Sequence, residues 1–108
     1  MRKITISIPI FDQEVTVIWG NTIESVFQYL ADTEGYINKN LSVEASTVDY
    51  EDGRIFICLT PETQDKIIVH ECVHAVYSLI NLLGISLEDE EVFAYLLEFL
   101  YGEIKKHV

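Results

Sequence analysis

The sequence predicts an α+β domain in which two β-hairpins form a small sheet packed on three helices, in the order β-β-α-β-β-α-α. Three observations predict this class. Apolar and polar residues alternate near the N-terminus, an Asp-Gly pair separates two β-rich segments near the middle, and apolar residues recur at helical spacing in the second half. A chain of 108 residues can bury one modest core, so residues 1–108 are predicted to be a single domain.

The first hairpin is predicted over residues 3–19. Residues 4–8 alternate between isoleucine and a hydroxyl residue, residues 15–19 are again rich in β-branched and aromatic side chains, and residues 11–13 can connect the two strands. Gly20 then breaks the pattern, so the hairpin is expected to end there.

A helix is predicted to follow this hairpin. Asn21 with Glu24 three residues later is typical of a helix cap, and the helix should end before Gly35. Its apolar residues fall at positions i, i+3, i+4 and i+7, namely Ile23, Val26, Phe27 and Leu30. Residues 36–45 carry only weak patterns and are predicted to form a loop.

The second hairpin is predicted from residues 47–50 and 54–59, because the Asp-Gly pair between them is a strong turn signal. Residues 60–62 (Thr-Pro-Glu) are typical of a helix start, since proline and acidic residues are favourable in a first turn. This helix should run to about Leu83, where Gly84 suits a C-terminal cap.

A last helix is predicted to open at Ser86 and to continue to Ile104. Its apolar face comprises Val92, Phe93, Leu96, Leu97, Leu100 and Ile104, and a second stripe comprises Glu91, Ala94, Tyr95, Glu98 and Gly102. The short connection at Gly84 predicts that the last two helices are antiparallel neighbours. The small residues in the second stripe suggest that this stripe approaches the preceding helix closely.

Composition and charge exclude several classes of partner. The formal net charge of −11 argues against binding to nucleic acid or to an anionic membrane, because phosphates would be repelled.

Two cysteines, Cys58 and Cys72, do not make a disulfide framework and are expected to be buried free thiols. Neither a signal peptide nor an apolar run of membrane-spanning length is visible, so a cytoplasmic location is expected.

The segment His70-Glu71-Cys72-Val73-His74 carries the most specific chemical signal. On a helix, His70 and His74 lie one turn apart on the same side and can share one Zn²⁺, with Glu71 close to a water on the metal. Apolar residues surround the motif on most of the helix, which predicts burial. Burying an acid and two imidazoles is costly unless they are paired or bind metal. The alternative is a hydrogen-bonded pair of core histidines.

Two histidines do not complete a catalytic zinc site, which normally has three protein ligands and a water. His107 is the remaining histidine, and its place beside the C-terminus favours a solvated tail residue. Carboxylates of the last predicted helix are therefore better candidates for the third ligand.

The motif followed by residues 90–95 (Glu-Glu-Val-Phe-Ala-Tyr) resembles the gluzincin branch of the zincin metallopeptidases. That branch uses H-E-x-x-H and a downstream glutamate in an N-E-x-x-A-like helix. The resemblance implies a minimal zincin-like fold and a zinc-dependent hydrolase. Matched on Ala94, it implies His70, His74 and Glu91 as Zn²⁺ ligands, with Glu90 as the competitor of Glu91, and Glu71 as general base.

The chain departs from the gluzincin pattern at two positions. Glu90 stands where the family often has asparagine, and Tyr95 stands where several members place an acid that orients the first histidine. The partner of His70 is therefore open, with Glu98 or a backbone carbonyl as alternatives, and Tyr95 could instead donate to a developing oxyanion. Zincins align substrate along an edge strand, for which residues 54–59 are the candidate; an ordinary core strand is the equal alternative for these residues.

Three functions are consistent with the sequence. The first is a zinc-dependent peptidase that acts on a peptide or protein substrate. The second is a zincin-like domain that binds metal or a partner protein without cleaving it. The third is an acidic interaction protein that presents a negative surface to a basic partner.

Overall fold

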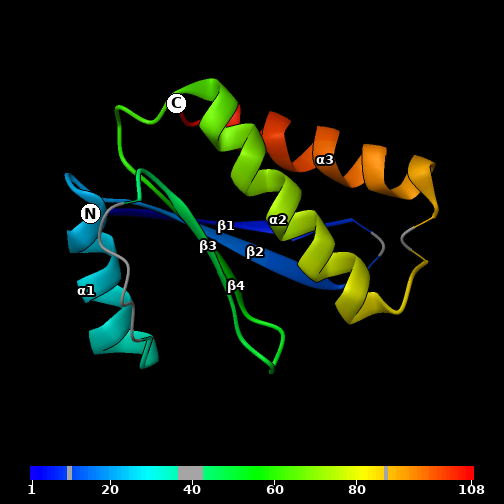
Figure 1. Ribbon diagram of the computed structural model, residues 1–108, viewed down its shortest axis with the longest axis horizontal. Helices are drawn as coiled ribbons and strands as arrows, with labels where there is room; N and C mark the ends of the chain where they lie inside the picture. The colour runs from blue at the N-terminus through cyan, green and yellow to red at the C-terminus, as the bar shows by residue number, and fades with distance from the viewer. Residues whose placement is uncertain (10, 37–42, 87) are drawn as a thin grey trace.

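A four-stranded mixed sheet, in the strand order β1-β2-β4-β3, separates helix α1 on one face from helices α2 and α3 on the other (Figure 1). The computed structural model describes residues 1–9, 11–36, 43–86 and 88–108. The elements are β1 (Arg2–Ile8), β2 (Gln13–Trp19), α1 (Ile23–Glu34), β3 (Ser46–Asp49), β4 (Ile55–Leu59), α2 (Asp65–Leu83) and α3 (Glu90–Lys105). The predicted α+β class and element order are confirmed.

Both predicted hairpins form, and a parallel pairing joins them. β1 pairs with β2 in antiparallel register from Arg2↔Trp19 to Ile8↔Gln13, and β3 pairs with β4 in the same manner. Strands β2 and β4 pair in parallel, so β4 is an interior strand in which every residue is buried. Of the two alternatives for residues 54–59, the core strand is confirmed and the edge strand is wrong, because β4 is paired on both sides and β3 is the edge.

Alternation along the strands distributes the core over both faces of the sheet. Val17 and Ile57 are fully buried on the face that α2 and α3 cover. Their neighbours Ile18 and Cys58 are fully buried on the face that α1 covers, where Phe27 and Leu30 of the helix meet them. The sheet is thus the middle of three layers.

The first helix begins one residue later than the sequence predicts. The N-cap is Thr22 rather than Asn21, because the Thr22 side chain accepts a hydrogen bond from the Ser25 backbone N–H and the Ser25 side chain completes a capping box. The helix ends at Gly35 in the left-handed conformation (φ 71°), as predicted. The predicted loop over residues 36–45 falls largely on residues 37–42, which lie outside the described residues.

The last two helices also begin later than predicted. Thr60 and Thr63 close a turn through two hydrogen bonds, Thr63 N–H to Thr60 O at 3.1 Å and Thr60 N–H to Thr63 Oγ1 at 2.9 Å. This turn occupies the predicted start at residues 60–62, so α2 begins at Asp65. Helix α3 begins at Glu90 rather than Ser86, because the Asp89 carboxylate accepts from the Val92 backbone N–H and caps it.

Helices α2 and α3 are antiparallel neighbours, as predicted. Lys105 pairs with Asp65 at 2.7 Å near one end, and the rings of Tyr77 and Phe93 lie 5.2 Å apart nearer the other. The predicted apolar face of α3 is confirmed, with Leu96, Leu100 and Ile104 fully buried.

The second stripe of α3 does not approach α2, so that prediction is wrong. All five of its residues are exposed: Glu91, Ala94, Tyr95, Glu98 and Gly102. A Cβ added at Gly102 would meet no atom within 4 Å. The stripe lies on the side of α3 opposite its apolar face, and burial of that apolar face sets the orientation of the helix.

Among the described helices, α2 is the one long and apolar enough to cross a bilayer by length and composition. Its inner side packs on the sheet, with Ile68, Cys72 and Leu79 buried there. A core helix of a globular domain has this same composition, so α2 is accounted for by its place in the fold.

Candidate metal and catalytic site

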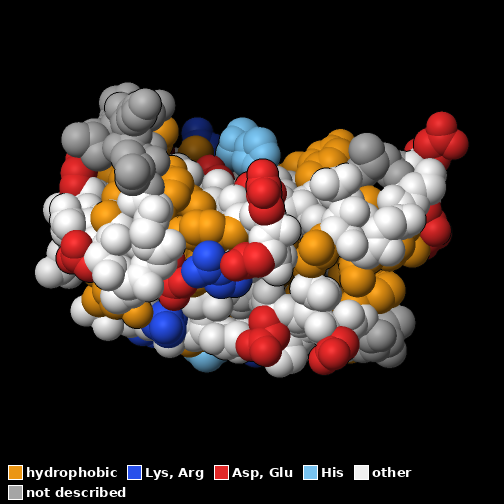
Figure 2. All heavy atoms as spheres, turned by 90° about the horizontal axis from the view of Figure 1, so that it is seen from below, with side chains coloured by type: hydrophobic (Ala, Val, Ile, Leu, Met, Phe, Trp, Pro, Cys, Tyr) orange, Lys and Arg blue, Asp and Glu red, His pale blue; other side chains and the backbone are white. Residues whose placement is uncertain are grey.

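The two motif histidines converge on the outer side of α2. The His70 and His74 ring centroids are 4.8 Å apart and their Nε2 atoms are 3.2 Å apart. Both residues are exposed, and Figure 2 shows histidine atoms in pale blue at the molecular surface. The prediction that both are buried is wrong, because the sheet covers only one side of α2.

The spacing of the two Nε2 atoms fits a shared zinc ion. Two Zn–N bonds of about 2.0–2.1 Å that span 3.2 Å meet at roughly 100–106°, close to the tetrahedral angle. The same separation also suits an N–H···N hydrogen bond between two neutral rings in complementary tautomers. The distance between the two nitrogens is therefore compatible both with a shared zinc ion and with a direct hydrogen bond.

Glu71 is buried, as predicted, and a residue of the edge strand holds it in place. The residue is 7% exposed and lies on the flank of α2 that faces β3. The Thr47 hydroxyl lies 2.9 Å from Glu71 Oε1 and 2.9 Å from the Glu71 main-chain oxygen. This contact offsets part of the cost of burying the carboxylate. Among the described residues, none donates a hydrogen bond to the other carboxylate oxygen.

A cavity of about 390 Å³ lies beside Glu71, between α2 and β3. Its lining comprises Ala45, Ser46, Thr47, Asp49, Glu71, His74, Tyr77 and Ser78. Ser78 Oγ donates to Asp49 Oδ2 at 3.0 Å, which makes a second side-chain contact between helix and strand after Thr47–Glu71. The cavity therefore places one motif histidine and the motif glutamate against the same open space.

Six residues of this lining were not predicted as site residues: Ala45, Ser46, Thr47, Asp49, Tyr77 and Ser78. Two of them had a usable signal, because Tyr77 and Ser78 lie three and four residues after His74 and so border the same side of the helix. Thr47 and Asp49 had none, since their approach to α2 depends on how the sheet packs.

The structure does not bring the predicted ligand set together. Among the described residues, no three His, Cys, Asp or Glu side chains lie close enough to hold one ion. The residues outside the description (10, 37–42 and 87) include none of these four types. Helices α2 and α3 are antiparallel, and the Tyr77–Phe93 contact sets their register. Because Tyr77 comes three residues after His74 and Glu91 comes two residues before Phe93, Glu91 lies about 7–8 Å further along the helix axis than His74. Glu90 lies further still. Glu91 as third ligand stays a prediction.

Tyr95 lies away from the motif. The residue is 47% exposed, and its ring stacks on Phe99 with centroids 6.3 Å apart. It borders a different cavity, together with Glu98. Neither Tyr95, the predicted oxyanion donor, nor Glu98, the alternative partner of His70, lines the cavity beside Glu71. The tyrosine in that lining is Tyr77.

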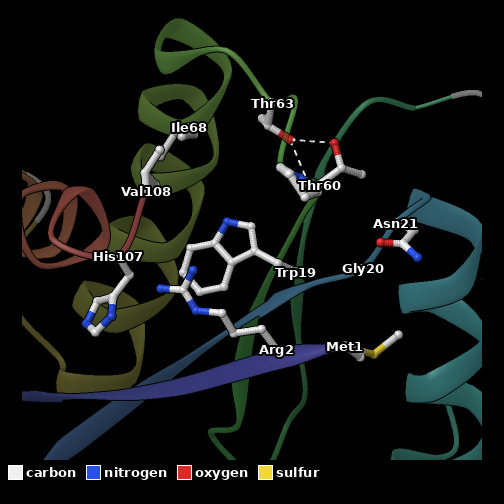
Figure 3. A pocket seen from close by; sticks show the side chains of 11 residues that line it. Met1, Arg2, Trp19, Gly20, Asn21, Thr60, Thr63, Ile68, His107 and Val108 are labelled. Carbon is white, nitrogen blue, oxygen red and sulfur yellow. Dashed lines mark hydrogen bonds between the residues drawn. The ribbon is translucent and has the colours of Figure 1, made fainter.

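His107 is separated from the other histidines and borders a cavity of about 360 Å³ near both chain ends (Figure 3). The Arg2 guanidinium lies 4.6 Å from the centre of the Trp19 ring, and Ile68 lines the same space. Among the described residues that line this cavity there is no Asp or Glu. Arg2 therefore supplies a cationic side chain to this cavity, whereas Glu71 and Asp49 supply carboxylates to the other.

Both cysteines are free and buried, as predicted. Burial, with a smaller contribution from the Glu71 carboxylate, raises the pKa of Cys58 and of Cys72 from 9.0 to about 12. Both thiols are therefore protonated at neutral pH and are not reactive nucleophiles.

We expect these thiols to react with a disulfide reagent at pH 8 only after unfolding. The pKa of Cys58 is about 12 in the folded protein, against an ordinary value of 9.0 for the unfolded chain. Between these two pH values the folded protein therefore retains a proton that the unfolded chain has lost. The free energy of unfolding should hence fall as pH rises through that window, and thermal melts in EDTA should show it. Fast labelling of the native protein would contradict the assigned burial.

Comparisons with protein-family models, curated proteins and solved structures gave no significant match to this chain. The likeness to gluzincins therefore rests on the motif residues alone.

Proposed function

We propose that this protein is a zinc-dependent peptidase that hydrolyses peptide bonds by activating water. The convergence of His70 Nε2 and His74 Nε2 to 3.2 Å, one turn apart and beside Glu71, supports this proposal best. The separation suits zinc, and the buried Glu71 lines the same cavity as His74.

In this proposal each side chain has one role. A Zn²⁺ held by His70 and His74 would polarise the attacking water and the scissile carbonyl. Glu71 takes the proton from the water and passes it to the leaving amine. Thr47 fixes one Glu71 oxygen and leaves the other available toward the cavity. The family resemblance assigns the third ligand to Glu91, with Glu90 as the alternative.

A second candidate is a zincin-like domain that binds metal or a partner protein without catalysis. The observation that favours it is the ligand count, since only two candidate ligand side chains meet among the described residues. For either candidate, the two free buried thiols support a reducing, cytoplasmic setting.

Metal analysis of protein purified without a histidine tag tests the shared part of both proposals. We expect one zinc per chain in the wild type and in His107→Ala, which removes a histidine far from the pair. His70→Ala and His74→Ala should each lose the metal. Absence of zinc from the wild type after loading, or retention by both single variants, would rule out the His70–His74 site.

A further inference from the structure

The cavity beside Glu71 adjoins a second one along the same strand. The neighbouring cavity, of about 290 Å³, is lined by Asp49, Tyr50, Glu51, Gly53, Ile55, Ser78, Asn81 and Leu82. Asp49 and Ser78 belong to both linings. The two cavities therefore adjoin at the Ser78–Asp49 hydrogen bond, and together they are here named the β3–α2 groove, from Glu71 to the turn between β3 and β4.

The charge of the β3–α2 groove is negative along its length. Asp49, Glu51 and Glu71 line it, and its described lining residues include no lysine or arginine. Arg54, in the same hairpin, pairs with Asp52 and Glu34 instead. The groove thus has no cation of its own to neutralise its carboxylates.

Two carboxylates in the groove have oxygens that no described residue satisfies. Glu71 is more than nine-tenths buried, yet one of its oxygens receives no hydrogen bond from the described residues. Asp49 uses Oδ2 to accept from Ser78, and Oδ1 has no described donor. Neither oxygen is among the buried atoms of the described residues that lack a partner, so both are open to solvent. A ligand that brings N–H donors and positive charge would form charge-assisted hydrogen bonds with them.

The shape of the site favours an extended chain. β3 is an edge strand, and no described residue pairs with its outer edge. Its alternate residues Thr47 and Asp49 both face α2, where they contact Glu71 and Ser78. A peptide lying along β3 could pair with the strand and place alternate side chains in the groove.

We propose that the β3–α2 groove binds an extended basic peptide segment, with lysine or arginine side chains beside Asp49 and Glu51. This inference rests on the proposed function only in treating the bound segment as substrate. The charge preference itself follows from the groove and does not require zinc.

The test measures binding by fluorescence anisotropy, with short labelled peptides that differ only in carrying arginine or glutamine. EDTA in the buffer prevents zinc-dependent cleavage during the measurement. We expect the arginine peptide to bind about tenfold tighter at low salt and to lose most of that advantage at about 0.5 M salt, because exposed charges are screened. Equal affinities at low salt would overturn the proposal.

Matched variants separate the groove from the overall acidity of the protein. Asp49→Asn keeps an acceptor for Ser78 but removes one charge from the groove, and Glu51→Gln does so at the neighbouring acid. Each should weaken the arginine peptide by about two- to fivefold, the contribution of one exposed ion pair. Asp12→Asn removes the same charge in the exposed β1–β2 turn and should have no effect. Equal effects of Asp12→Asn and Asp49→Asn would contradict the proposal.

Zinc-loaded protein then distinguishes this inference from the proposed function. Selective binding of the arginine peptide without cleavage supports the groove and argues against the peptidase. Cleavage of both peptides at equal kcat/KM supports the peptidase and overturns the groove preference. Faster cleavage of the arginine peptide, reduced by Asp49→Asn through KM, supports both.

Discussion

Replacing Glu71 with glutamine should lower peptide hydrolysis by about 10²–10⁴-fold while zinc remains bound. Glutamine has the same shape and can still accept the Thr47 hydroxyl hydrogen bond, so the fold should be kept. It cannot take a proton from water, so only the chemical step should be lost. Turnover of a labelled unstructured protein, measured beside zinc content, checks this result.

The control for this experiment is Glu98→Gln, which removes a carboxylate from the exposed side of α3 and should leave turnover and zinc unchanged. Undiminished hydrolysis by Glu71→Gln would exclude Glu71 as the base. The pair Glu91→Gln and Glu90→Gln addresses the third ligand in the same assay. Loss of zinc from the first alone would support Glu91, and loss from the second alone would support Glu90.

Replacing Gly20 with alanine should lower the free energy of unfolding by about 1–3 kcal/mol. A Cβ there would lie 2.6 Å from Ser25 Oγ and 2.7 Å from Val26 Cγ2. Ser25 belongs to the capping box of α1, and the Gly20 N–H donates to the Leu59 carbonyl at 3.1 Å. Relief of the clash must therefore shift α1 or the end of β2. Urea unfolding measures the loss.

The matched substitution Gly102→Ala should have the opposite sign. Gly102 is an exposed helical residue with no atom within 4 Å of an added Cβ, so alanine should stabilise by about 0.5–1 kcal/mol through helix propensity. Destabilisation by Gly102→Ala would mean that this side of α3 is packed against another surface in solution. A neutral Gly20→Ala would show that α1 is less closely packed on the end of β2.

Local patterns predicted the fold well where neighbours in sequence decide the structure. The alternation in residues 4–8 predicts a strand with one buried side, and the Asp-Gly pair predicts the turn between β3 and β4; both are confirmed. Helix starts were predicted less well. At the start of α1, Asn21 and Thr22 are both good N-cap residues, and the choice of Thr22 depends on which side chain reaches the backbone N–H of the first turn.

The candidate site divides in the same way. Helical periodicity alone requires His70 and His74 to share one side of a helix, and the structure confirms that their rings meet. Helical periodicity does not determine whether that side faces the core, and the prediction of burial was wrong for both histidines. Apolar neighbours surround the motif in sequence, but a single sheet covers only half of a helix.

The sequence by itself determined the elements, their order and the pairing of two imidazoles one helical turn apart, because each depends on contacts within a few residues. The tertiary structure decided that β3 is the edge strand, that Thr47 meets Glu71, and that the Glu91 stripe faces solvent. These depend on the parallel pairing of β2 with β4 and on burial of the α3 apolar face. Such long-range packing minimises exposed apolar area over the whole chain and leaves no local signal.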